Sequence, residues 1–152
     1  MARIELHAKI NTNALQSRIQ DAVIDSRTGT AVHNLLAKMC DPYVPFLEGP
    51  LSQTVEVYHD KIRYTQPYAR YQYYGEVYGP NIPIVQDGMI VGWFSPPGQK
   101  KHPTGRAINY SKDKHPLSSS FWDKAMLKDK GDEFNEQVKA ILVHMINSNT
   151  TE

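Results

Sequence analysis

The amino-acid sequence predicts an α+β domain, in which a small, mostly antiparallel sheet is packed by a long N-terminal helix and by C-terminal helices. Two observations carry this prediction. Short segments of alternating apolar and polar residues are separated by turn residues, and apolar residues recur at helical spacing near both ends of the chain. The chain has 152 residues, the usual length of one domain. We therefore expect a single domain that spans residues 1–152.

The N-terminal part predicts a strand followed by the long helix. Apolar residues alternate with other residues over residues 4–10, which indicates a strand. From residue 15 to residue 39 apolar residues recur at helical spacing, which predicts either one amphipathic helix or two helices that break near Gly29. The helix should end before Pro42, because the residue before a proline is pushed out of the helical conformation.

The middle of the chain predicts two hairpins that flank a short helix. Residues 55–57 and 62–64 alternate on either side of a polar turn, and Asp87-Gly88 joins two apolar segments as a two-residue hairpin turn. Between them, Pro67 suits the first position of a short helix and Gly75 suits its left-handed C-terminal position.

The last third predicts a loop and then helices. Residues 95–118 are polar and rich in Pro, Gly and Lys, which indicates a long loop that is mobile unless a partner orders it. The serines at 118–120 are expected to cap a helix, and the helical pattern breaks at Gly131 before it resumes. Trp122 lies three and four residues before Ala125 and Met126, so it should face the core and anchor these helices.

Composition argues against several classes of protein. The net charge of +1 argues against a dedicated nucleic-acid binder, which usually carries a clear basic excess. A single cysteine, Cys40, forms neither an internal disulfide nor a multi-cysteine zinc site, so we expect folding in a reducing cytoplasm. No apolar run approaches the ~18 residues that span a membrane, and the N-terminus lacks the apolar core of a signal peptide. We therefore expect no membrane partner.

Catalytic motifs are absent from the sequence. The six histidines share no short metal-ligand spacing, and there is no HExxH motif and no glycine-rich nucleotide-binding run. Cys40 is better explained as a buried small side chain than as a nucleophile. We therefore expect a protein that is not an enzyme, with no catalytic residue, no metal and no cofactor.

Two clusters are candidates for binding. Six of the nine tyrosines fall between residues 64 and 78. Those on the short helix over residues 67–75 cannot all be buried in the domain, which favours an interface with a neighbour over a base-stacking platform. The expected interface residues are Tyr68, Arg70, Tyr71, Tyr74 and Tyr78. The second cluster is the basic stretch with Lys100, Lys101 and Arg106, which is either a solvated loop or a contact for phosphates or an acidic partner.

Three sequence segments, in order, resemble motifs of the phage minor capsid proteins, a family that looks related to phage neck and tail-completion proteins. The first is Asp41-Pro42-Tyr43-Val44-Pro45-Phe46 with Gly49-Pro50-Leu51-Ser52, similar to a proline-phenylalanine and glycine-x-leucine signature. The second is the tyrosine-rich segment 67–75. The third comprises Asn109-Tyr110-Ser111, His115-Pro116-Leu117 and Phe121-Trp122-Asp123-Lys124-Ala125-Met126. The resemblance covers roughly residues 10–145, and residues 80–105 depart from it by a more elaborate hairpin.

The resemblance implies a structural virion protein of a tailed bacteriophage, made in the bacterial host cytoplasm. It implies a subunit of the neck, head-tail connector or tail-completion complex, in a homo-oligomeric ring of six- or twelve-fold symmetry around the DNA path. The implied partners are other neck proteins (adaptor, stopper, tail terminator and portal) and genomic DNA in the lumen. Phe46, Leu51 and Trp122 would be structural residues.

Two other functions stay open on the residues alone. One is a nucleic-acid-binding module that uses the basic loop and the tyrosine-rich segment. The other is a small hydrolase that pairs Cys40 with a histidine or uses the acidic cluster at residues 129–136.

Overall fold

The computed structural model describes residues 3–8, 25–46 and 50–149. Its helices are α2 (Ser26–Cys40), a single 3-10 turn (Asp41–Tyr43), α3 (Pro50–Gln53), α4 (Ala69–Tyr74) and α5 (Trp122–Asn149). Its strands are β1 (Ile4–Leu6), β2 (Val55–Val57), β3 (Ile62–Tyr64), β4 (Glu76–Gly79), β5 (Ile82–Gln86), β6 (Met89–Phe94) and β7 (His102–Ala107). The expected mixture of helices and small antiparallel sheets is confirmed.

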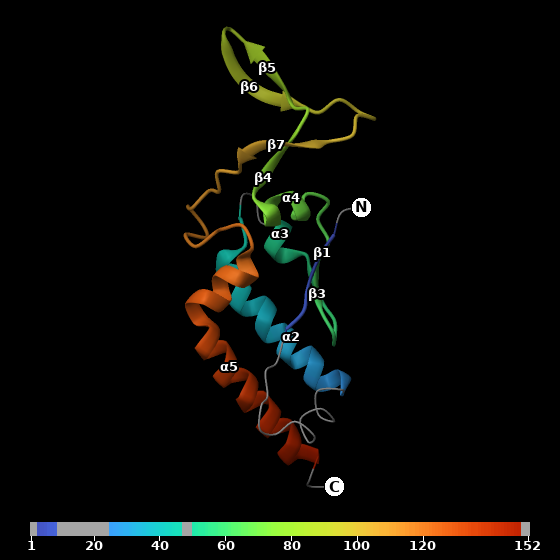
Figure 1. Cartoon of the computed structure of the whole chain (residues 1–152), viewed down its shortest axis with the longest axis vertical. Coiled ribbons are helices and arrows are strands. Elements are labelled where there is room, and N and C mark those ends of the chain that lie inside the picture. Colours follow the sequence, from blue (N-terminus) through green and yellow to red (C-terminus); the bar gives the residue numbers. More distant parts are fainter. Residues whose placement is uncertain (1–2, 9–24, 47–49, 150–152) are drawn as a thin grey trace.

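The molecule is elongated and has three parts (Figure 1). The body consists of α2, α5 and the sheet β1-β3-β2. Strands β4 and β7 form a two-stranded ribbon that leaves the body, and the hairpin β5–β6 projects beyond the ribbon. We call β4–β7 the ribbon and β5–β6 the arm. The sequence predicts one small sheet, but the strands form three separate antiparallel sheets.

Helix α2 packs closely against the body sheet. The Asp25 side chain accepts a hydrogen bond from the backbone N–H of Arg27, 3.3 Å away, and so caps the helix N-terminus. Helix α2 begins at Ser26, because Asp25 has an extended backbone with φ −65° and ψ 125°. The expected long helix from residue 15 to residue 39 is therefore not continuous. The interruption lies at Asp25, four residues before the expected break at Gly29, and Gly29 itself lies inside α2. A Cβ atom at Gly29 would lie 2.2 Å from the carbonyl oxygen of His59 in the β2–β3 turn. The missing side chain therefore allows the helix and the turn to touch. The first half of the expected long helix, residues 15–23, lies outside the described residues.

His33 connects β1 to the same helix. Its Nε2 accepts a hydrogen bond from the backbone N–H of Ala8 at 3.2 Å, so its Nδ1 carries the proton and donates it to the carbonyl of Gly29 at 2.9 Å. A buried histidine with both ring nitrogens bonded to the backbone is a structural residue.

The segment 95–118 contains a strand, contrary to the expected loop. Strand β7 pairs antiparallel with β4, with an irregular register between Glu76 and Tyr78. Side chains reinforce this pairing: the Thr104 hydroxyl donates to the carbonyl of Val77 at 2.6 Å, and the Glu76 carboxylate accepts from the N–H of Gly105 at 3.0 Å. Whether the rest of the segment is mobile stays a prediction.

Helix α5 packs along α2 and carries the largest core side chain (Figure 1). Lys130 departs from helical geometry with a φ of −130°, so the helix bends one residue before Gly131, where the pattern predicts a break. Phe121, not a serine, occupies the position before the helix, which corrects the expected serine cap. Trp122 is fully buried, and its ring meets the rings of Tyr64 and Tyr73 edge-on with centroids 5.1 and 4.9 Å away.

We predict that Gly29→Ala destabilises the protein, because its Cβ would overlap the His59 carbonyl, a rigid backbone atom. Overpacking of this kind costs about 1–3 kcal/mol of unfolding free energy. Gly131→Ala is the matched control, since nothing lies within 4 Å of a Cβ there, and it should stabilise the helix by up to ~1 kcal/mol. Urea denaturation measures both, and equal effects of the two variants would contradict the close helix–turn contact.

We also predict that Trp122→Ala lowers the unfolding free energy by about 3–5 kcal/mol, because it leaves a cavity in the core. The chain offers its own control in Trp93, which lies on the arm and is 56% exposed. Trp93→Ala should change the unfolding free energy by no more than ~0.5 kcal/mol. Thermal unfolding followed by circular dichroism separates the two, and an unchanged melting temperature for Trp122→Ala would overturn the assignment.

Candidate functional site

The arm exposes more apolar surface than any other part of the described chain. Of fourteen large apolar or aromatic side chains that are exposed among the described residues, eight belong to the arm, each between 48% and 67% exposed. These are Ile82, Ile84, Val85, Met89, Ile90, Val91, Trp93 and Phe94. At about 100 Å² for each half-exposed side chain, they present on the order of 800 Å² of apolar area. This sum covers both faces of the arm; the largest contiguous apolar patch of a soluble monomer is about 300–600 Å².

Both faces of the arm are apolar. Ile82 pairs with Phe94 on one face, and Pro83 pairs with Trp93 on the other. The register shifts between Ile84 and Val85, and beyond this shift Val85 pairs with Ile90. A hairpin that packs on a core by one face usually shows polar residues on the other. The arm therefore has two faces that can be covered by a partner.

The arm ends in a tight turn. Asp87 and Gly88 have φ values of +52° and +78°, the two positive values that a type I′ hairpin turn requires, as the dipeptide predicts. Asp87 is also the only charged residue between residues 82 and 94. The surface of the arm is thus almost entirely uncharged.

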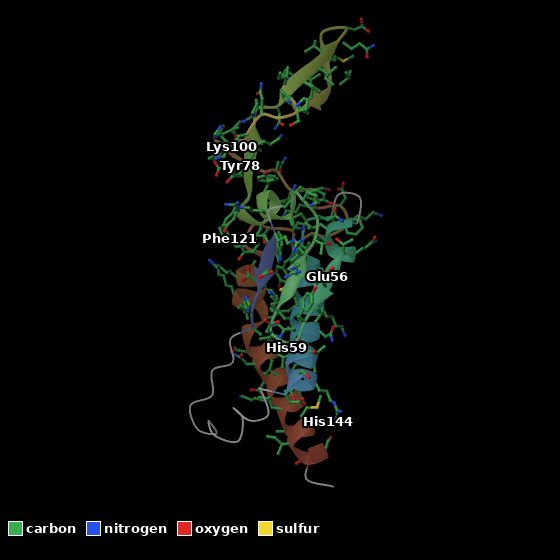
Figure 2. The ribbon with its side chains drawn as sticks, turned by 90° about the vertical axis from the view of Figure 1, so that its right-hand side faces the viewer. Glu56, His59, Tyr78, Lys100, Phe121 and His144 are labelled. Atoms are coloured by element: carbon green, nitrogen blue, oxygen red, sulfur yellow. The ribbon has the colours of Figure 1, made fainter. Side chains whose placement is uncertain are left out.

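A groove lies between α4 and the base of the ribbon. It has a volume of about 570 Å³. Its aromatic and aliphatic lining comprises Tyr68, Tyr71, Val77, Tyr78 and Ile108, and its polar lining includes Glu76, Asn81 and Lys101. We call it the tyrosine groove. The Tyr71 and Tyr78 rings pack against each other with centroids 4.6 Å apart, and Figure 2 shows Tyr78 between the body and the arm.

The structure divides the five expected interface residues into two groups. Tyr68, Tyr71 and Tyr78 line the tyrosine groove. Arg70 and Tyr74 do not line it; the Arg70 guanidinium lies over the Tyr74 ring at 5.9 Å, and this ring contacts Phe121 at the start of α5. The groups differ because positions 68 and 71 share one side of the short helix, whereas 70 and 74 share another.

The structure also separates the three candidate basic residues. Lys101 lines the groove, where its Nζ donates to the side-chain oxygen of Asn81 at 2.7 Å. Lys100 and Arg106 are exposed and do not line the groove. The charged residues that line the groove in the described part of the chain are thus one lysine and one glutamate. Their charges balance, whereas phosphate binding favours a basic surface.

The candidate structural residues lie in or beside the core. Trp122 and Leu51 are buried. Phe46 is half-buried, and its ring packs against the His115 ring with centroids 4.9 Å apart.

The whole of this architecture, apart from the chain ends, is covered by one family model. The model of the minor capsid proteins matches residues 6–144. The chain belongs to the phage minor capsid protein family. It is therefore a structural protein of the phage virion. No curated protein and no solved structure matches the chain.

The arm is a candidate site of this minor capsid protein that no sequence motif indicated. A signal was present, because both alternating sets of residues between 82 and 94 are apolar, which is unusual for a hairpin with one solvated face. Periodicity alone does not tell whether such a hairpin is buried within its own domain or exposed.

The described residues give no evidence for a metal site or for a reactive cysteine. No group of three or more His, Cys, Asp or Glu side chains among them is placed to hold a metal ion. No described helix is long and apolar enough to cross a membrane. Cys40 is fully buried, and burial, with a smaller contribution from the negative charge of Asp123, raises the pKa of its thiol to about 12. At neutral pH the thiol is protonated and a poor nucleophile.

We predict that Cys40 in the native protein resists maleimide at pH 7.5, whereas Cys40 in the unfolded chain reacts. An introduced Val143→Cys on the exposed face of α5 is the positive control, since Val143 is exposed. The raised pKa also lowers stability in alkali. The unfolded chain loses the thiol proton above about pH 8.5, and the folded chain retains it up to pH 12, so the unfolding free energy should fall by about 1.4 kcal/mol per pH unit between these values.

Cys40→Ala should remove this slope between pH 8.5 and 10, where the tyrosines do not yet contribute. Above pH 10, burial raises the pKa values of Tyr64 and Tyr73 and adds to the loss in both proteins. Rapid labelling of native Cys40, or an unaltered slope in the variant, would contradict the assignment of a buried, protonated thiol.

Proposed function

We propose that this minor capsid protein is a ring-forming subunit of the phage neck, in the head-tail connector or the tail-completion complex, and that the ring surrounds the DNA path. The observation that carries the proposal is the exposed apolar area of the arm. An area on the order of 800 Å² equals the share that one partner contributes to a stable protein interface. A virion subunit with such a surface is built to be covered by neighbours in an assembly.

The two different surfaces of the subunit support a ring rather than a symmetric dimer. A self-complementary patch joins two copies and then closes, whereas two different patches join copies head to tail, which gives a ring where the rotation closes and an open filament where it does not. The arm and the tyrosine-bearing helix α4 lie in different parts of the elongated subunit (Figure 1). The proposed interface residues are Tyr68, Arg70, Tyr71, Tyr74 and Tyr78.

The proposed partners are further copies of the chain, in six- or twelve-fold symmetry, and the neighbouring neck proteins: adaptor, stopper, tail terminator and portal. The exposed Lys100 and Arg106 are candidates to face genomic DNA in the lumen, because cations on a pore wall attract phosphates.

Antibody labelling of purified phage tests the position. We expect gold particles at the head–tail junction of each phage, and about six or twelve copies of the chain per phage by quantitative mass spectrometry, as a closed ring requires. The major capsid protein, labelled in parallel, is the control for a protein spread over the head. Label over the whole head, or a copy number in the hundreds, would refute a neck ring.

A further inference from the structure

We propose that the arm of one subunit docks into the tyrosine groove of a second copy of the same chain. The proposal rests on the proposed ring, and it names the two surfaces that form each subunit contact. It also assigns a role to the arm, for which the sequence motifs indicated none.

The first argument is area. A stable interface buries about 800 Å² on each partner, and the apolar side chains of the arm present an area of this order. Trp93 and Phe94, the aromatic residues of β6, are both at least half exposed. They pair with Pro83 and Ile82 at the end of the arm that joins the ribbon, so they would pack against the surface around the groove when the tip enters it. Aromatic side chains are enriched at such interfaces.

The second argument is the chemistry of the two surfaces. An uncharged arm is suited to an apolar partner surface and not to phosphates or a charged peptide. The tyrosine groove offers such a surface, because Tyr68, Tyr71 and Tyr78 present rings with hydroxyl groups. Tyrosine is enriched at interfaces because its ring is buried while its hydroxyl keeps a hydrogen bond.

The third argument is charge. Asp87 at the tip is the only charge of the arm, and Lys101 is the only cation among the described residues that line the groove. The groove also contains the Glu76 carboxylate, which already accepts a hydrogen bond from the N–H of Gly105. Lys101 bonds to the neutral amide oxygen of Asn81 and makes no ion pair within the described part of the chain. An arm that enters the groove with its tip toward Lys101 therefore brings opposite charges together, which fixes the orientation of docking.

The fourth argument is geometry. The arm points away from the body at the far end of the ribbon, whereas the groove lies at the base of the ribbon (Figure 1). A subunit in this conformation does not fill its own groove, so each subunit offers one free arm and one free groove. Contacts of this kind are heterologous and generate a ring where the rotation closes.

Site-directed cross-linking in phage particles tests the contact. A phage lacking its own copy is complemented with the full-length chain carrying Val85→Cys on the arm and Gln72→Cys in the groove lining, and is treated with a short bismaleimide. Both positions are at least partly exposed, so the substitutions leave the fold intact. We expect a ladder of cross-linked products that ends at the size of the closed ring. Each single substitution should give monomers alone.

Two further variants test whether the cross-link is specific to the arm. Val91→Cys, the second arm position, should give the same ladder with Gln72→Cys. Val143→Cys, as exposed as Val91 but on α5, should give none. The buried Cys40 remains in all variants and should not react.

The outcomes also separate this contact from the proposed ring. Gold label at the neck without a ladder, in both arm variants, overturns arm-in-groove docking and leaves the ring intact. Cross-links from the arm to a different virion protein, or products that stop at the dimer, overturn the head-to-tail contact. Flotation of the purified chain with phosphatidylglycerol vesicles, abolished by Trp93→Ser, would assign the arm to lipid and overturn the proposal as well.

Discussion

The packing of Trp122 against Tyr64 and Tyr73 is the contact on which the rest of the structure depends. It joins the start of α5, the end of β3 and helix α4, three elements that are distant in the sequence. The Tyr73 hydroxyl donates to the Asp123 carboxylate at 2.8 Å, and the N–H of Phe121 donates to the carbonyl of Tyr73 at 2.8 Å. These bonds fix the point where α4 ends. They therefore fix the direction in which the ribbon leaves the body and the place where the arm is presented.

Elements with a local signal could be predicted from the sequence. Gly75 ends α4 with a φ of +73°, and the Asp87-Gly88 turn forms, because each depends on its own backbone geometry. Strand β7 was missed because Pro103 and Gly105 lie within it, and both residues are poor strand formers that only a two-stranded ribbon tolerates. The sequence left open a break near Gly29, because the reason for a glycine there is tertiary: the β2–β3 turn that approaches it lies some thirty residues away in sequence.

In the candidate interface, too, some features depend on the local sequence and others on contacts with distant parts of the chain. The tyrosine cluster is evident in the sequence, but its members occupy different structural positions. Tyr64 and Tyr73 are core residues, whereas Tyr71 and Tyr78 line the groove. Helical spacing assigns residues of α4 to sides, yet which side is covered depends on Trp122 and on the ribbon. For the arm, alternation predicts two strands and their turn, whereas its exposure depends on the absence of any packing element within the described part of the chain.

The composition of the arm has a consequence for the free subunit. An uncharged hairpin rich in β-branched and aromatic residues, with two open strand edges, has the hallmarks of a segment prone to fibrillar aggregation. Two residues oppose this. Pro83 removes a backbone donor from β5, and Asp87 places a negative charge at the tip, so that arms stacked in register would repel each other. Pro83 and Asp87 thus lie where residues that oppose strand stacking are usually found in aggregation-prone segments.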